Sequence, residues 1–157
     1  MSEARPKIEC MFDIGCRGLD DAGVVDAIGS GARTEAAAAA HRLAAVAELV
    51  RRRCGGDDRA LWACDSWDAA AAEVSAAMGV SSGRASTEMY LAAALFTRLP
   101  RLAALFMQGL VGYRVVVAIV DRTDLVTEDQ ALAAIDEALA GLAGGWGGLS
   151  RYKLDQC

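Results

Sequence analysis

Apolar residues recur at three- and four-residue steps along much of the chain, which is the spacing of one face of an α-helix. The longest such pattern predicts a helix over residues 32–53, where Glu48 stands one turn before Arg52 and can form an ion pair with it. The predicted buried stripe of this helix consists of Ala36, Ala39, Leu43, Val46, Ala47 and Val50.

The N-terminal part of the chain has a weaker pattern. A separate short helix is expected over residues 19–30, ended by Gly29 and Gly31, because glycine is the poorest helix former after proline. Residues 1–18 show no clear period, and we expect them to be poorly ordered. They carry mixed charges without an apolar run, so they do not read as a secretory signal.

Two helices are predicted around a tight turn in the middle of the chain. The first is expected to be capped by Asp65 or Ser66 and closed by Gly79, and the second to be capped by Ser81 or Ser82. The apolar face of the second helix consists of Ala85, Met89, Ala92, Phe96 and Leu99. Pro100 allows a fresh helix start after it.

Residues 102–120 approach the length of a membrane-spanning helix. Gly109, Gly112 and Arg114 interrupt this segment, and a charge there would be costly in lipid. We therefore expect two short buried helices joined at the glycines, the second over residues 113–123.

The last predicted complete helix opens at a capping box that starts at Thr127, and it continues to Ala143. Its apolar stripe consists of Leu132, Ile135, Leu139 and Leu142. Residues 144–157 form a glycine-rich joint followed by the start of a truncated helix at Ser150.

Composition agrees with these patterns. Alanine, the best helix former, occurs 33 times, and proline occurs only 2 times. A chain of 157 residues with 54% hydrophobic residues can bury one sizeable core. The sequence therefore predicts an all-α protein with a single domain of six or seven helices over residues 19–143.

Residues 76–89 raise the question of a helix-turn-helix, which would form a corner within residues 66–98. Gly79 suits the turn, but Glu88 stands where the pattern wants an apolar residue, and the apolar Met89 is one step away. The exposed side of the second helix would comprise Ser82, Arg84, Ser86, Thr87 and Glu88, with Arg84 and Glu88 spaced to pair. Two interpretations remain open: a corner between core helices, which is favoured, and a DNA-reading unit.

Charge does not favour a dedicated nucleic-acid binder. The net charge is −5, whereas such proteins usually have a basic face and a high isoelectric point. Arginine occurs 14 times and lysine 2 times, a bias that a GC-rich genome explains. The candidate DNA contacts are Arg51, Arg52, Arg53, Arg84 and Arg114. Trp62 and Trp67 are expected to hold their segment against the core rather than to stack on bases.

No constellation of residues indicates catalysis, a cofactor or a metal site. The 5 cysteines lack a CxxC spacing, and the single histidine, His41, falls on the polar side of the long predicted helix. We find no phosphate-binding P-loop, and Ser82 lacks the preceding strand and histidine partner of a nucleophile elbow. No catalytic residue and no cofactor are therefore assigned.

Four blocks of the chain resemble the 13E12 repeat family, whose actinobacterial, chiefly mycobacterial members contain the domain of unknown function 222. The blocks are, in order, RLAAVAELVRRR, ALWACDSWDAAAAEVSAAMGVSSGRAS, LFTRLPRLAALFMQGLVGYRVVVAIVDRT and EDQALAAIDEALAGLAGGWGGLSRYKLDQ. Together with their flanks they extend the resemblance over residues 11–157, and their order makes it specific.

The resemblance implies an N-terminal helical domain that usually precedes an HNH endonuclease module, in proteins that look like mobile genomic elements. HNH chemistry needs a histidine base with further histidine or asparagine residues around a metal ion. After Val115 the chain contains neither residue type, so the HNH module is absent from it.

Three hypotheses follow for a cytoplasmic, non-catalytic chain. It is an accessory DNA-targeting domain of an HNH nuclease, a protein–protein or dimerisation module, or an inactive truncated remnant of a mobile element. Its expected partners are accordingly DNA, a second copy of itself, or a C-terminal HNH module, and neither a membrane nor a small-molecule substrate is expected.

Overall fold

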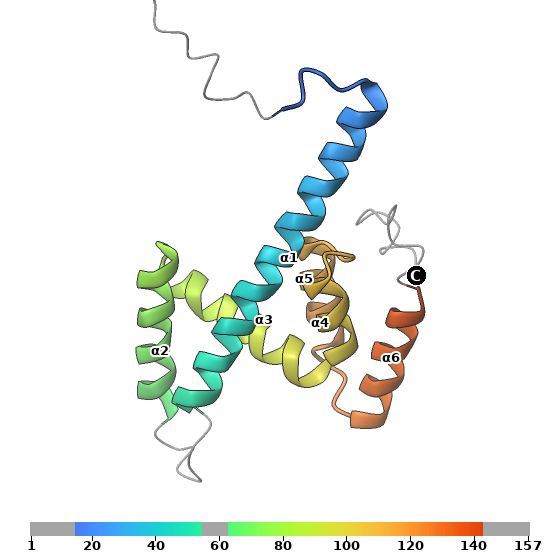
Figure 1. Ribbon diagram of the computed structural model, residues 1–157. Helices are drawn as coiled ribbons and strands as arrows, with labels where there is room; N and C mark the ends of the chain where they lie inside the picture. Colours follow the sequence, from blue (N-terminus) through green and yellow to red (C-terminus); the bar gives the residue numbers. More distant parts are fainter. Residues whose placement is uncertain (1–14, 55–62, 143–157) are drawn as a thin grey trace, which may run out of the picture.

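The computed structural model describes residues 15–54 and 63–142, with side chains in the second range described from Ser66 onward. Within these ranges the protein contains six α-helices and no strand, which confirms the all-α prediction (Figure 1). The helices are α1 (Asp21–Cys54), α2 (Ala63–Met78), α3 (Ser82–Arg98), α4 (Pro100–Met107), α5 (Tyr113–Thr123) and α6 (Asp129–Leu142).

The prediction of two helices before Cys54 is wrong, because α1 runs without a break through Gly29 and Gly31. A glycine inside a helix costs about 1 kcal/mol relative to alanine, which a helix of 34 residues can accommodate. Neither glycine has the positive φ that commonly ends helices. The composition of the segment therefore weakens the helix without ending it.

Helix α3 lies at the centre of the molecule. It contacts every other helix, with α1 and α2 as its most extensive neighbours. Figure 1 shows α1 crossing the molecule diagonally, with α2 on one side and α4, α5 and α6 on the other. The N-terminal part of α1 projects beyond the other helices.

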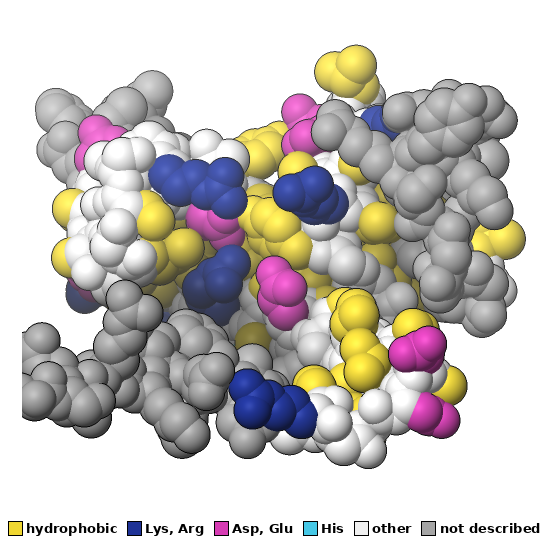
Figure 2. All heavy atoms as spheres, turned by 90° about the horizontal axis from the view of Figure 1, so that it is seen from above, with side chains coloured by type: hydrophobic (Ala, Val, Ile, Leu, Met, Phe, Trp, Pro, Cys, Tyr) yellow, Lys and Arg dark blue, Asp and Glu magenta, His cyan; other side chains and the backbone are white. Residues whose placement is uncertain are grey.

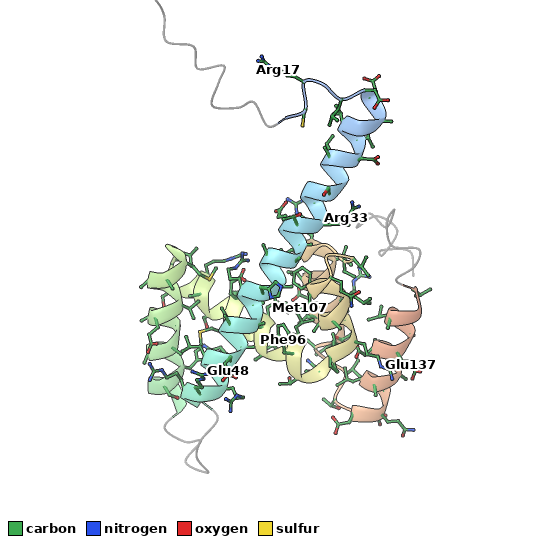
Figure 3. The ribbon with its side chains drawn as sticks, in the orientation of Figure 1. Arg17, Arg33, Glu48, Phe96, Met107 and Glu137 are labelled. Carbon is green, nitrogen blue, oxygen red and sulfur yellow. The ribbon has the colours of Figure 1, made fainter. Side chains whose placement is uncertain are left out.

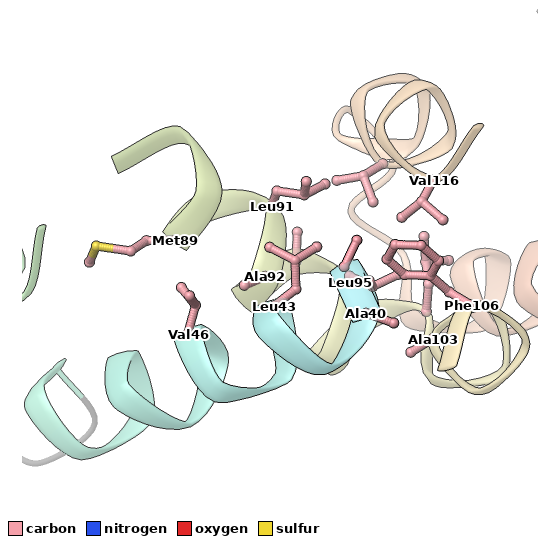
Figure 4. Packing of buried hydrophobic residues seen from close by; sticks show 14 of the residues in the cluster. Ala40, Leu43, Val46, Met89, Leu91, Ala92, Leu95, Ala103, Phe106 and Val116 are labelled. Carbon is pink, nitrogen blue, oxygen red and sulfur yellow. The ribbon is translucent and has the colours of Figure 1, made fainter. Parts of the chain in front are cut away.

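The core forms where the predicted stripes of α1 and α3 meet (Figure 4). Leu43 of α1 and Leu95 of α3 are fully buried beside Phe106 of α4 and Val116 of α5. The remaining predicted stripe residues of α1 are also buried, except Ala47, which is half-buried. In α3 the predicted face is buried apart from the half-buried Phe96. Complete burial of one large apolar side chain stabilises the fold by about 1.5–3 kcal/mol.

The turn between α2 and α3 has the predicted chemistry. Gly79 adopts φ +65°, the left-handed conformation that ends a helix, and Ser81 caps α3 by accepting a hydrogen bond from the amide of Arg84. The predicted start of α2 is wrong, because the helix begins at Ala63, so Asp65 and Ser66 lie inside it.

The expectation of two short helices within residues 102–120 is confirmed, since α4 ends at Met107 and α5 begins at Tyr113. Gly109, at φ +73°, makes the turn between them, and Pro100 opens α4 as predicted. Among the described residues no single helix is long and apolar enough to cross a membrane. Helices α3 and α4 reach that length only as a pair bent by 112°.

Helix α6 begins at Asp129, two residues after the predicted cap at Thr127. It is attached to α4 by Asp136, a buried carboxylate that accepts hydrogen bonds from the backbone amides of Arg101 and Leu102, at 2.8 and 2.9 Å. Leu132 is buried as predicted, whereas Leu142, the last residue of α6, is exposed and does not extend the stripe.

Several predictions fall on residues that lie outside the described ranges. They are the poorly ordered N-terminus up to residue 14, the role of Trp62, the glycine-rich joint from residue 144 and the helix expected at Ser150.

Candidate functional site

The most unusual side chain in the core is Glu88, which is only 1% exposed on the central helix α3. Its carboxylate accepts hydrogen bonds of 2.6 Å from Arg84 and from the hydroxyl of Tyr113, and Arg42 of α1 lies 3.8 Å away. A buried carboxylate is stable only when it is paired and hydrogen-bonded. The Glu88 cluster, formed by these four side chains, therefore joins α1, α3 and α5.

The surroundings of Tyr113 in this cluster change the pKa of its phenol. Burial of its ring, followed by the hydrogen bond to Glu88, raises the pKa of Tyr113 to about 12. The phenol therefore remains protonated and continues to donate to the carboxylate at neutral pH. This arrangement holds helices together, and a phenol with so high a pKa is a poor general base at neutral pH.

The burial of Glu88 corrects the proposed exposed side of a DNA-reading helix. That side was expected to include Glu88, which is buried, and Ser86, which is half-buried beneath Trp67 and accepts its indole hydrogen bond at 2.8 Å. A recognition helix must present one side to a DNA groove, whereas α3 contacts each of the other five described helices and buries part of that side. The structure therefore favours a corner between core helices.

Three of the five candidate DNA contacts lie together at the C-terminal end of α1, and each is ion-paired with a carboxylate. Arg51 and Arg52 bind Glu48 at 2.7 and 2.6 Å, and Arg53 binds Glu73 of α2 at 2.9 Å. The hydrogen bonds from Arg51 and then Arg52 lower the pKa of Glu48 to about 2. The predicted Glu48–Arg52 pair is thus confirmed, and Arg51 shares the same partner.

The other two candidates, Arg84 and Arg114, lie at the starts of α3 and α5. Arg84 belongs to the Glu88 cluster and also donates to the hydroxyl of Tyr113 at 3.1 Å. Arg114 is exposed and borders a shallow surface hollow with Asp121. The structure therefore brings Arg84 close to Arg42, which sequence reasoning missed, and leaves Arg51 to Arg53 at a separate place.

Figure 2 shows one face of the molecule, on which basic and acidic side chains alternate with hydrophobic side chains between them. On this face the described residues form no continuous band of positive charge. His41 is exposed, as expected, and the described residues contain no group of three or more His, Cys, Asp or Glu side chains that could hold a metal ion.

A groove of about 520 Å³ separates α1 from α2. Apolar side chains such as Leu49, Val74 and Met78 line it, and the charged side chains of Arg42 and Glu73 stand at its edges. The groove thus links the Glu88 cluster to the Arg53–Glu73 ion pair along one side of the molecule.

The N-terminal part of α1, residues 21–35, is here named the α1 arm. None of its residues is buried, and the first buried residue of the helix is Ala36. The arm projects from the body in Figures 1 and 3, and Arg33 is labelled near its base. Val25 and Ile28 of the arm are 65% and 67% exposed, which is high for apolar side chains on a helix.

The apolar positions of the α1 arm lie on the same face as the buried stripe of α1. At 100° per residue, Val25, Ile28 and Ala32 fall within the sector that contains Ala36 and Leu43 further along the helix. The face that packs against α3 and α4 therefore continues onto the arm. The turn at Gly109 lies against the backbone of Arg33 at the base of the arm, and Val25, Ile28 and Ala32 remain exposed.

Sequence reasoning missed two buried acids, Glu88 and Asp136. Each stands in an otherwise apolar stripe with a potential partner in another helix, which single-helix periodicity does not reveal. Two signals pointed to Glu88: its i, i+4 spacing from Arg84, and its place where the helix-turn-helix pattern wants an apolar residue.

The fold and these contacts define an all-helical domain without a recognisable catalytic centre in its described part. By sequence, the chain belongs to the family of the domain of unknown function (DUF222), whose profile matches residues 30–157. No solved structure matches it.

The curated relatives come from Mycobacterium tuberculosis. The chain is 50% identical to the uncharacterized protein Rv2100 over 163 residues, and the match covers 99% of this chain and 29% of that protein. It is 51% identical to the uncharacterized protein Rv3776 over 140 residues, covering 89% of this chain and 27% of that protein. The chain thus spans less than a third of the length of these two relatives.

Proposed function

We propose that this domain is a non-catalytic protein-interaction domain that docks a helical partner through the α1 arm. The observation that supports this most directly is the continuation of the core-facing stripe of α1 onto the arm. Val25 and Ile28 remain exposed there, in the positions on the helix face that the buried residues Leu43 and Val46 occupy in the body.

The physical chemistry of the α1 arm favours a partner. The arm is the part of α1 without buried residues, and it carries Gly23, Gly29 and Gly31, each costing about 1 kcal/mol relative to alanine. A partner covering Val25 and Ile28 would bury two branched apolar side chains and so stabilise the arm as a helix.

We further propose that the domain acts within a longer protein, as an accessory to a catalytic part of the HNH type. Two observations support this: the chain spans less than a third of the length of Rv2100 and Rv3776, and it resembles the 13E12 repeat family. This proposal includes a cytoplasmic location. The alternative to it is that the domain is an inactive remnant of a mobile element.

A DNA-targeting role is the second candidate. It is favoured by one local observation: the half-exposed side chains of Arg42 and Arg84 share a single carboxylate, and the exposed Arg114 follows Tyr113. This group has an excess of positive charge that could contact phosphates, whereas the carboxylates Glu48 and Glu73 offset the charge of Arg51, Arg52 and Arg53.

Photo-cross-linking in the native cells tests the proposed interaction. A photoreactive phenylalanine analogue is placed at Ile28 and, as a matched control, at Leu125, which is 91% exposed in the turn before α6. We expect a discrete protein adduct from position 28 and none from position 125. Equal labelling at both positions, or no protein adduct at position 28, would contradict the proposal.

Fluorescence anisotropy with a short labelled duplex tests the DNA candidate. Binding through phosphates weakens steeply as salt rises. Arg114→Glu should weaken it, whereas Arg17→Glu, on the segment before α1, should not. No change in anisotropy at low salt would exclude DNA as the partner of the chain.

A further inference from the structure

We propose that the partner of the α1 arm is the α1 arm of a second copy, packed antiparallel about a two-fold axis near Gly29 and Ser30. This proposal rests on the proposed function, because it names the helix that the arm binds. A two-fold interface requires a surface that is complementary to itself. The arm has two sets of residues that meet this requirement, one apolar and one charged.

The apolar component is a narrow stripe with small residues at its centre. Val25, Ile28, Gly29 and Ala32 share one face of the arm. An antiparallel pair centred between positions 29 and 30 sets Ile28 of each copy at the level between Gly29 and Ala32 of the other. Each large side chain then meets small residues of the facing stripe.

The glycines have no steric reason within the described part of the chain. A Cβ atom at Gly31 would meet nothing within 4 Å, and one at Gly29 would meet only the guanidinium of Arg33, at 3.5 Å. Both glycines also weaken the helix. Gly29 lies on the stripe, so close approach of a second backbone is a physical reason for glycine at that position.

The charged component consists of Asp26 and Arg33. They are about two turns apart and project from the same flank of the stripe. Among the described residues neither side chain has an ion-pair partner. In the antiparallel pair, the same flanks of the two copies lie side by side, so each Asp26 faces the Arg33 of the other copy and two equivalent ion pairs form.

In a parallel two-fold pair, the same flanks of the two copies would lie on opposite sides of the interface, so Asp26 and Arg33 of one copy would not face those of the other. The antiparallel arrangement brings each Asp26 next to an Arg33 of opposite charge, so the charge pattern favours it. One pair of short helices is smaller than a standard interface of about 1,600 Å². The dimer is therefore expected to dissociate on dilution.

Sedimentation equilibrium of the full chain over a range of concentrations tests the dimer with charge-swapped variants. Asp26→Arg alone and Arg33→Asp alone each set like charges opposite one another, so we expect each to weaken dimerisation about tenfold. Ile28→Asp should abolish it. Asp129→Arg, an exposed reversal on α6, is the matched control and should leave it unchanged.

The decisive sample is a mixture of the two single variants. A copy with Asp26→Arg presents two arginines to a copy with Arg33→Asp, which presents two aspartates, so the mixture should form a heterodimer as tight as the wild-type dimer. The double variant D26R/R33D should likewise recover self-association. A mixture that stays monomeric, or a wild-type chain that is monomeric at every concentration, would overturn the antiparallel dimer.

The cross-linking experiment separates this proposal from the general one. An adduct from position 28 with twice the mass of the chain supports the dimer. An adduct with a different protein, together with a monomeric chain in sedimentation, overturns the dimer and leaves the interaction domain standing.

Discussion

The hydroxyl of Tyr113 donates a 2.6 Å hydrogen bond to the buried carboxylate of Glu88, and this contact joins α5 to the central helix α3. Removal of the hydroxyl leaves a buried acceptor with one donor fewer, so Tyr113→Phe should lower the free energy of unfolding by about 1–3 kcal/mol. Urea denaturation measures this. The control Tyr90→Phe removes a bond to Asp124 at the surface and should cost less than about 1 kcal/mol.

The raised pKa of Tyr113 predicts a specific loss of stability in alkali. The folded pKa of about 12 lies above the ordinary value of 10.0, so the protonated phenol stabilises the folded state. Its contribution is fully present below pH 10 and is lost as the pH rises from 10 through about 12. Ultraviolet titration of the wild-type chain minus that of Tyr113→Phe should show phenolate forming near pH 12. A difference curve with its midpoint near 10 would contradict the buried contact.

Two adjacent acids on α6 should behave very differently. Asp136 accepts two backbone hydrogen bonds at the start of α4, so Asp136→Ala leaves buried amides unpaired and should cost about 1–3 kcal/mol. Glu137 is exposed and only pairs with Arg101 at 3.3 Å, so Glu137→Ala should change stability by less than about 1 kcal/mol. Thermal and urea unfolding compare the two variants, and equal effects would show that α6 is not held through Asp136.

Gly109 and Gly79 both have a positive φ but differ in the space around them. A Cβ at Gly109 would lie 2.4 Å from the carbonyl oxygen of Arg33, whereas one at Gly79 would meet nothing within 4 Å. Gly79→Ala should therefore cost only the backbone penalty of about 1–2 kcal/mol. Gly109→Ala should cost clearly more, because α1 or the turn must move. Urea denaturation measures the loss of stability in both variants. A larger loss for Gly79→Ala than for Gly109→Ala would show that the α4–α5 turn does not pack against Arg33.

Local signals in the sequence predicted the helix ends that depend on local chemistry. Gly79 and Ser81 act within one turn of the backbone, so the turn before α3 was predicted correctly. Gly29 and Gly31 carry a similar signal, yet α1 continues through them, because a glycine ends a helix only when its backbone takes the left-handed conformation. Residue type alone does not reveal that conformation.

The burial of Glu88 and Asp136 could not be predicted from local signals, because it depends on contacts between helices. Glu88 and Asp136 are stabilised by groups from other helices, Tyr113 in one case and the amides of Arg101 and Leu102 in the other. Periodicity places a residue on a face of its own helix and says nothing about which polar group lies opposite. The projection of the α1 arm was missed similarly, because its stripe matches that of a buried helix.

The central position of α3 also bears on the order in which the protein folds during synthesis. The ribosome releases α1 and α2 first, and their stripes find their principal partner only when the chain as far as Arg98 has emerged. Until then the apolar stripe of a 34-residue helix is open to chaperones and to aggregation. Helices α4 to α6 then add to a nucleus that already exists, so nascent chains stalled before and after α3 should differ sharply in protease resistance.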